Sequence, residues 1–395
     1  MNGSYLVILI LLVGIASLVQ GDFIFRTVYL VAGALLAGRW WNGRILQNAD
    51  FKRELNTRAF LGEDIPVRLE VRNPGWLPAP WLHVYDSLPT ELAAPNLVNR
   101  VVSLPPRGKT ALEYTLHARK RGYYKLGPLF ISTGDILGLG NEERREGATD
   151  YLTVYPEIVP LTKVRLPSRS PQGTLRHTQP IFEDPTRVLS KRDYVAGDSL
   201  RRVDWKSSAV AGRLQVKQFE PSIALETAIF LNLNTLEYPS NVCIDATELG
   251  IVVAASLAAW IVGQKQTVGL LTNGIDPLDP QQPFVPLPPR KGRGHLMRVL
   301  DVLARVQAGE TRPLIDLLRQ ETPALAWGTT AIVLTGKVDD EVFDELFHVR
   351  RRGLDVVLIL VGRLPGSQEA QQRAEHFGIP LYRFQSTKEL DLWRQ

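Results

Sequence analysis

Two apolar stretches at the N-terminus constrain the fold of this chain most strongly. Tyr5 to Val19 is uncharged and almost wholly apolar, and Phe23 to Trp41 is again apolar apart from Arg26 and Arg39. Each is near the short end of the roughly 17–25 residues that a helix needs to cross a bilayer. A secretory signal peptide is the alternative for the first stretch, but it lacks a positive n-region and a second apolar stretch follows at once. We therefore expect a two-helix membrane anchor over residues 1–45.

Charges around this hairpin predict its orientation. Only Asp22 and Arg26 lie near the turn. The positive residues that follow the second stretch are Arg39, Arg44, Lys52 and Arg53. Because positive flanks stay on the cytoplasmic side, both ends of the hairpin are expected in the cytoplasm, with Trp40 and Trp41 at the inner membrane interface. A single cysteine, Cys243, excludes an intramolecular disulfide and agrees with a reducing compartment.

Residues 46–158 show a different pattern, with short alternating runs that turn residues separate. The expected strands are Pro66 to Asn73, Trp81 to Leu88, Ala111 to Ala118, Tyr123 to Leu126, Leu129 to Ser132 and Tyr151 to Tyr155. Such spacing without a helical period predicts a small β-sandwich domain.

The segment from Arg187 to Glu220 packs alternating charges around a few large apolar residues, and no simple period explains it. Asp198 and Ser199 are suited to cap a short helix whose buried side is Leu200 and Val203. Arg213 to Glu220 then has the pattern of a strand. We assign residues 159–223 as a linker followed by this segment.

Two carboxylates in this segment allow two interpretations. Arginine pairs bidentately with a carboxylate, so Asp198 and Asp204 suit fixed ion pairs with Arg192, Arg201 or Arg202 in a structural network. The alternative is an active site in which Asp198 and Asp204 act as paired carboxylates.

The pattern of this segment resembles the signature of the bacterial domain-of-unknown-function family fifty-eight. The residues that carry the resemblance are Arg192, Tyr194, Gly197, Asp198, Arg201, Asp204, Trp205, Lys206, Ser208 and Ala209. The departures are Val210, where the family commonly has arginine, and Ser222, where an acid is common. The resemblance implies no settled biochemical activity.

Residues 224–395 alternate between strand and helix patterns. The expected strands are Ala228 to Leu233, Val268 to Thr272, Ala331 to Leu334, Val356 to Val361 and Leu381 to Phe384. The expected helices include Thr247 to Val262, a helix around Leu296 to Leu303, Asp340 to Arg351 and Gln368 to Phe377. This alternation predicts a mostly parallel sheet with helices on both faces, a Rossmann-like α/β domain.

The order of these elements resembles a von Willebrand factor A domain, which implies a Mg²⁺ site after the first strand. Asn232 stands where that site has its first aspartate, Asn234 replaces a serine, and Thr335 is followed by Gly336 instead of an aspartate. Mg²⁺ is normally held through one or two carboxylates. We therefore expect a degenerate site that holds no metal, and the sequence indicates no other cofactor.

These observations lead to a membrane-anchored, non-enzymatic scaffold whose cytoplasmic α/β domain meets another protein. By resemblance, the expected partner is a MoxR-type AAA+ ATPase, and the expected location is the bacterial inner membrane. The signature then docks that partner or braces the fold. Nucleic acid is not implied, because the formal charge of +5 is modest and dispersed. The alternatives are a hydrolytic enzyme using Asp198 and Asp204, and a metal-dependent adhesion module.

Overall fold

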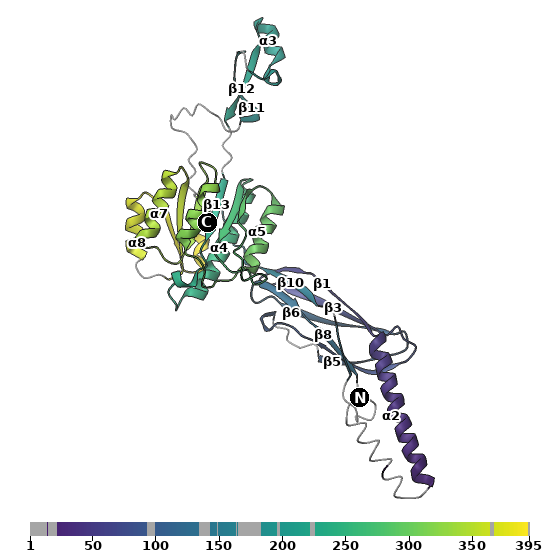
Figure 1. Cartoon of the computed structure of the whole chain (residues 1–395). Coiled ribbons are helices and arrows are strands. Elements are labelled where there is room, and N and C mark those ends of the chain that lie inside the picture. The colour runs from purple at the N-terminus through teal and green to yellow at the C-terminus, as the bar shows by residue number, and fades with distance from the viewer. Residues whose placement is uncertain are drawn as a thin grey trace. The chain divides into compact units, whose positions relative to one another are not determined.

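The computed structural model of the chain describes Gly14 and residues 22–92, 99–133, 143–147, 149–162, 164, 183–195, 198–221, 226–363 and 367–393. The chain has a multi-domain fold of sheets and helices and divides into two compact units, Met1–Glu157 and Ile158–Gln395 (Figure 1). Apart from Gly14, the expected first membrane helix lies outside the described residues.

The first unit opens with a helix and continues as β-strands. Its elements are α2 (Asp22–Asn48), β1 (Asp50–Leu55), β2 (Arg58–Phe60), β3 (Asp64–Arg72), β4 (Ala79–Asp86), η1 (Thr90–Leu92), β5 (Asn99–Leu104), β6 (Lys109–His117), β7 (Gly122–Leu126), β8 (Leu129–Thr133), β9 (Glu143–Glu146) and β10 (Asp150–Tyr155). They form sheets in the orders β1-β3-β6, β2-β10-β7 and β5-β4-β8-β9. Each expected strand is present, and β1, β2, β5 and β9 are additional.

One face of the sheet β1-β3-β6 carries the core of this unit. Along β3, Ile65, Val67, Leu69 and Val71 are buried while their neighbours are more exposed, as alternation in a strand requires. Leu69 and Val71 pack with residues of β4 and β8, whereas Ile65 and Val67 pack with residues of β7 and β10. The two other sheets therefore cover successive parts of the same face.

A buried arginine links the three sheets. Arg53 Nη2 lies 2.5 Å from Asp86 Oδ1, and its Nη1 lies 2.6 Å from Asp150 Oδ2. Tyr114 donates a hydrogen bond of 2.6 Å to Asp86 Oδ2. The side chains of Arg53 and Asp86 are 3% and 0% exposed. Arg53 thus belongs to the core of the β unit and not to the charged flank of a membrane helix.

The C-terminal end of α2 is built into the same unit. Ile45 and Leu46 join the core between the sheets. Arg145 Nη1 donates hydrogen bonds to the carbonyls of Leu46 and Ala49, at 3.0 and 2.6 Å, near the end of the helix. Trp41 packs against this core and donates to the carbonyl of Pro78 at 3.0 Å. Trp41 is therefore fixed on the β unit, while Trp40 is 53% exposed.

The second unit contains a long hairpin and then an alternation of strands and helices. Its elements are β11 (Glu183–Asp193), η2 (Leu200–Arg202), α3 (Trp205–Ala211), β12 (Gln215–Pro221), β13 (Glu226–Leu231), η3 (Thr235–Glu237), α4 (Cys243–Gly263), β14 (Thr267–Thr272), β15 (Leu287–Arg290), α5 (Arg293–Arg305), α6 (Leu314–Glu321), η4 (Thr322–Ala324), β16 (Thr330–Thr335), α7 (Asp340–Arg351), β17 (Asp355–Val361), α8 (Ser367–His376), β18 (Leu381–Phe384) and η5 (Thr387–Trp393).

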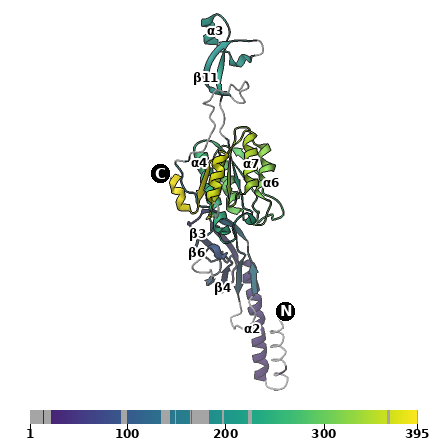
Figure 2. The same cartoon turned by 90° about the vertical axis from the view of Figure 1, so that its left-hand side faces the viewer.

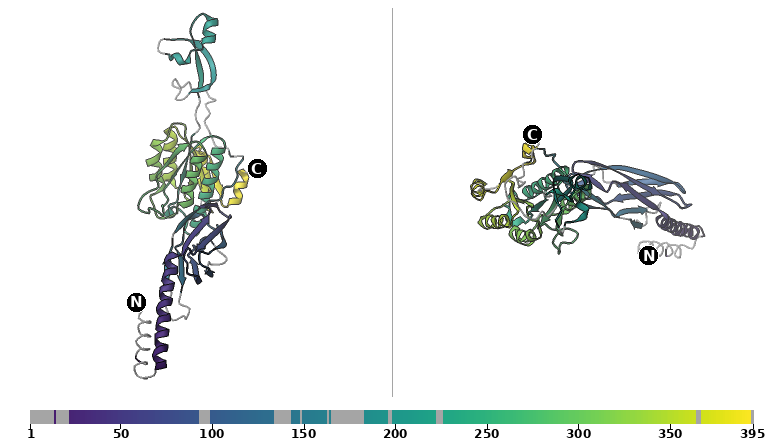
Figure 3. Two further views of the ribbon diagram at one scale, coloured as in Figure 1. Left: turned by 90° about the vertical axis from the view of Figure 1, so that its right-hand side faces the viewer. Right: turned by 90° about the horizontal axis from the view of Figure 1, so that it is seen from above.

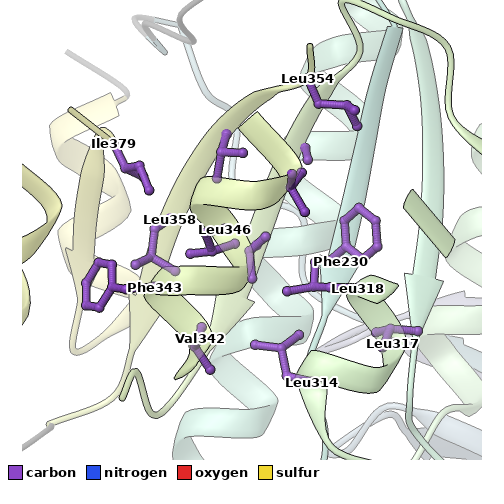
Figure 4. Packing of buried hydrophobic residues seen from close by; sticks show 14 of the residues in the cluster. Phe230, Leu314, Leu317, Leu318, Val342, Phe343, Leu346, Leu354, Leu358 and Ile379 are labelled. Atoms are coloured by element: carbon purple, nitrogen blue, oxygen red, sulfur yellow. The ribbon is translucent and has the colours of Figure 1, made fainter. Parts of the chain in front are cut away.

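Six of these strands form one sheet in the order β15-β14-β13-β16-β17-β18. All neighbours are parallel except β15, which pairs antiparallel with β14 at one edge. The sheet has helices on both faces, with α4 on one and α6 and α7 on the other (Figure 2, Figure 3). Figure 4 shows the core beneath α6 and α7, to which Phe230 of the sheet, Leu317 and Leu318 of α6, and Phe343 and Leu346 of α7 all contribute. β15 and α6 were not predicted.

The helix α4 is long and apolar enough to cross a membrane, and it is the only such helix among the described residues. However, 72% of its apolar window is buried inside the unit. Gly250 packs against Leu231 and Val361 of the sheet. A helix that is apolar on all sides is expected in the core of an α/β domain, so its composition follows from burial between the sheet and neighbouring helices.

Candidate functional site

The hairpin β11–β12 carries the signature residues. Its strands pair antiparallel, with Lys191 opposite Lys217 and Asp193 opposite Gln215. The excursion between the strands holds η2 and α3. Backbone hydrogen bonds join its ends to the strands, from Tyr194 N to Leu214 O at 2.9 Å and from Asp204 N to Gln215 O at 2.8 Å.

Asp198 is held by Arg192 in a bidentate ion pair. Arg192 Nη1 and Nη2 donate to the two carboxylate oxygens at 2.6 and 2.7 Å. The backbone N–H of Val195 donates a third hydrogen bond, at 2.9 Å. These donors, the Arg192 guanidinium first, lower the pKa of Asp198 from its usual value. An arginine partner for Asp198 was expected, and of the three candidates it is Arg192 that forms the pair.

Asp204 has a different set of partners. Its Oδ1 accepts from the N–H of Ser207 at 3.2 Å, which caps the N-terminus of α3. Its Oδ2 lies 2.9 Å from Lys191 Nζ. The hydrogen bond from Lys191, followed by that from Ser207, lowers the pKa of Asp204 to about 2. The expectation of an arginine partner is wrong, because the strand pairing brings Lys191 to this carboxylate.

Ser208 fastens α3 to the hairpin. It is buried, its hydroxyl donates to Asp204 O at 2.8 Å, and it accepts from the N–H of Gln215 at 2.8 Å. Val203 and Val216 are buried beside it. The side chains that hold α3 against β12, Ser208, Val203 and Val216, are therefore small.

The large signature residues lie at the surface. Trp205 is 66% exposed, and Arg201 and Lys206 are also exposed. Leu200 is 61% exposed, so the expectation that it faces the interior is wrong, whereas Val203 is buried as expected. Ser199 makes no side-chain cap to η2, so the predicted cap is also wrong. Tyr194 is half-buried, and Gly197 lies outside the described residues.

The two signature acids have different partners and share none. Asp198 is bound by Arg192 and Val195, and Asp204 by Lys191 and Ser207. Both groups have lowered pKa values, whereas two carboxylates that share a proton raise the pKa of one of them. The geometry therefore fits two structural ion pairs.

A second polar cluster lies at the carboxyl end of β13, where ligands bind in many α/β sheets. Asn232 is fully buried and donates to Thr335 Oγ1 at 2.9 Å and to Glu237 Oε2 at 2.7 Å. Its Oδ1 accepts from Asn234 N at 3.1 Å and from Asn273 Nδ2 at 2.8 Å. The predicted positions Asn232, Asn234 and Thr335 are thus brought into one network.

Glu237, Tyr238 and Asn273 complete this network, although the sequence analysis did not single them out. Glu237 also accepts from Leu314 N at 3.2 Å, and burial raises its pKa. Tyr238 donates to Asn232 O at 2.6 Å. Asn273 follows β14 directly, so its position at the carboxyl end of a neighbouring strand was the available signal.

The arrangement does not fit a resident Mg²⁺ ion. The Asn232 amide directs hydrogens at Glu237 and Thr335, whose oxygens would be needed as ligands. A Cβ on Gly336 would lie 2.0 Å from the Tyr238 ring, so this ring fills the space beside Gly336. Across the described residues there is no group of three or more His, Cys, Asp or Glu suited to hold a metal.

Residues 190–361, which run from the hairpin to β17, match the family described as "Protein of unknown function DUF58". The uncharacterized protein YeaD of Bacillus subtilis is 23% identical over 322 residues, covering 80% of this chain and 76% of that protein. An aerotolerance-related membrane protein of Bacteroides fragilis is 12% identical, with a TM-score of 0.31, over 43% of this chain and 97% of that one. A CARDB domain of Pyrococcus furiosus gives a TM-score of 0.21 at 16% identity, over 28% of this chain and 94% of that one. The family match therefore places residues 190–361, from the hairpin to β17, in the DUF58 family.

Proposed function

We propose that the protein is a membrane-anchored, non-enzymatic scaffold that presents its C-terminal unit to another protein. The observation that carries the proposal is that the hairpin pairs its acids with cations and leaves large apolar side chains exposed. Its acids, Asp198 and Asp204, are engaged in ion pairs, while Leu200, Trp205 and Val210 are exposed. Exposed large apolar side chains on a small, firmly fixed element are typical of a binding surface.

Hydrolysis by Asp198 and Asp204 is the competing function, and their surroundings count against it. A general acid needs a pKa near the working pH, which burial or a neighbouring like charge provides. Here the neighbouring cations lower both pKa values. The carboxylates therefore lack the proton that a general acid would donate at neutral pH.

The C-terminal α/β domain is proposed to be a degenerate von Willebrand factor A-like domain that binds without metal. Its strand order supports this reading together with the resemblance of its element order. The buried amide network around Asn232 replaces the ion and fixes the same loops. A metal-dependent adhesion module is disfavoured, since Asn232 and Gly336 supply no charge.

Membrane anchoring is proposed through α2 and the preceding apolar stretch. Tyr29, Leu30 and Leu36 are 73%, 72% and 67% exposed, which suits a surface in contact with lipid or with another helix. Arg39 and Arg44 follow this apolar region and favour a cytoplasmic location for the C-terminal end of α2. We infer a multi-pass protein of the bacterial inner membrane, with a β-sandwich next to the membrane.

The proposed partner is a MoxR-type AAA+ ATPase, on the family resemblance. The test is direct binding of a MoxR-type ATPase from the same organism to the full chain in lipid nanodiscs, measured by biolayer interferometry. We expect saturable binding with a dissociation constant in the micromolar range or below. No binding in any nucleotide state of the ATPase would refute this partner.

A further inference from the structure

We infer that Leu200, Arg201, Trp205, Lys206 and Val210 form a docking face for an acidic polypeptide segment with interspersed apolar side chains. The inference deepens the proposed scaffold function and rests on it. It names the recognition chemistry of the hairpin.

The apolar part of this docking face does not contribute to the core of its own element. Leu200, Trp205 and Val210 are 61%, 66% and 87% exposed. On α3 the buried side chain is Ser208, which contacts the backbone of β12, so Trp205 and Val210 are left to the solvent. An exposed tryptophan beside aliphatic groups offers the kind of anchor that carries most of the energy of protein interfaces.

The charged part of the docking face is positive, because the acids of the hairpin are neutralised elsewhere. Asp193 lies 3.0 Å from Arg213, while Asp198 and Asp204 are held by Arg192 and Lys191. In the described part of the chain, Arg201 and Lys206 form no ion pair with a carboxylate. Both cations are exposed, and each directly follows an exposed apolar residue in the chain, Arg201 after Leu200 and Lys206 after Trp205, so both are available to glutamate or aspartate side chains of a partner.

The pattern of charge favours a polypeptide over a lipid surface or a nucleic acid. Binding to those polyanions depends mainly on many cations of one sign. The hairpin instead alternates cations with carboxylates, and three of its cations, Lys191, Arg192 and Arg213, are already paired with Asp204, Asp198 and Asp193. A peptide matches such a mixed surface through a few carboxylates placed around an apolar anchor.

The test uses the full chain in nanodiscs of neutral lipid and a short fluorescein-labelled peptide of glutamates interspersed with leucine and phenylalanine. Binding is followed by fluorescence anisotropy. We expect Trp205→Ala to weaken binding about tenfold or more and Lys206→Glu about fivefold or more. Neither side chain is buried, so the melting temperature of both variants should match that of the wild type.

Matched controls are Trp76→Ala, whose side chain is 70% exposed in the first unit, and Lys291→Glu, an exposed cation outside the hairpin. Both should bind the peptide as the wild type does. Equal loss in the controls, equal binding of a lysine version of the peptide, or no binding at all would overturn the inference. So would Trp205-dependent binding to phosphatidylglycerol vesicles or duplex DNA with the peptide inactive.

The same variants separate this inference from the proposed function. If the ATPase binds wild type and Trp205→Ala equally, the scaffold function stands and the docking face is wrong. If the peptide binds in a Trp205-dependent way and the ATPase does not bind, the docking face stands and the proposed partner is wrong.

Discussion

At the residue scale, the cation paired with each signature acid determines whether Asp198 and Asp204 are structural or catalytic. Arg192 and Asp198 belong to one recognisable motif, and their bidentate pairing follows from the chemistry of arginine and carboxylate. The lysine that holds Asp204 comes from outside that motif, and only the register of β11 with β12 brings it there. The residue types therefore indicated that Asp198 pairs with an arginine, without choosing among three, and they did not indicate the lysine partner of Asp204.

Asp86→Ala should destabilise the β unit by about 3–5 kcal/mol, because it leaves the buried Arg53 guanidinium without its fully buried partner. Urea unfolding of the full chain, followed through the circular dichroism of the strands, measures this change. Glu54→Ala is the control, since it breaks only the exposed pair with Lys52 and should leave the transition in place. Equal transitions for Asp86→Ala and wild type would show that Arg53 is not held as described.

At the scale of elements, the carboxyl ends of β13, β14 and β16 are joined by amides in place of a cation. Asn232, Asn273 and Thr335 follow or end three neighbouring parallel strands, and their hydrogen bonds hold the loops together. The resemblance to a von Willebrand factor A domain singled out Asn232 and Thr335 from the sequence. It did not predict Glu237 and Tyr238, because their approach depends on the path of η3.

Asn232→Asp should lower the stability of the α/β domain by about 3 kcal/mol or more, since it replaces a donor to Glu237 and Thr335 with a buried like charge. Thermal melting in the presence of a chelator measures the change. Asn241→Asp is the matched control at an exposed position and should melt as the wild type does.

Calorimetry on the wild type should show no single-site micromolar isotherm with Mg²⁺. Such an isotherm, or an unchanged melting temperature for Asn232→Asp, would contradict the amide network as the substitute for a metal.

Gly336→Ala should destabilise the same domain by about 1–3 kcal/mol, because its Cβ would lie 2.0 Å from the Tyr238 ring. Gly294→Ala is a suitable comparison: no atom lies within 4 Å of its Cβ, and alanine favours the helix α5. A loss of stability in the second variant and none in the first, read from urea unfolding, would reverse this assignment.

At the scale of the whole molecule, different sequence patterns predicted the strands of the two units. Period-two runs predicted β3, β4, β6, β7, β8 and β10 of the β unit but not β1 and β5, and buried runs predicted the parallel sheet. The short strands β2 and β9, and the edge strand β15, lack such patterns because pairing with neighbours defines them. The extension of α2 into the β unit was missed for the same reason: its last residues are fixed by contacts with Arg145.

The proposed topology makes a prediction for the whole chain. A reporter fused after Gln395 should be active in the cytoplasm, and a short tag inserted at Gly21 should be accessible from outside the cell, because Arg39 and Arg44 follow the apolar region. Reporter activity and tag labelling in intact cells measure both. An exported C-terminus with a protected tag would invert the orientation.

The central claim is that Asp198 and Asp204 are structural partners of cations and not catalytic acids. NMR titration of ¹³C-labelled aspartate carboxyls in the full chain tests it, with Asp198→Asn and Asp204→Asn used to assign the signals. Because both pKa values are lowered from 3.8, the two ion pairs contribute their full stabilisation above that pH, and the contribution is lost as the pH falls through the folded-state pKa values. We predict that both carboxyls titrate below pH 3.8 and that the pKa of Asp204 is about 2. A pKa raised toward neutrality for either carboxyl would contradict the structural role and favour acid catalysis.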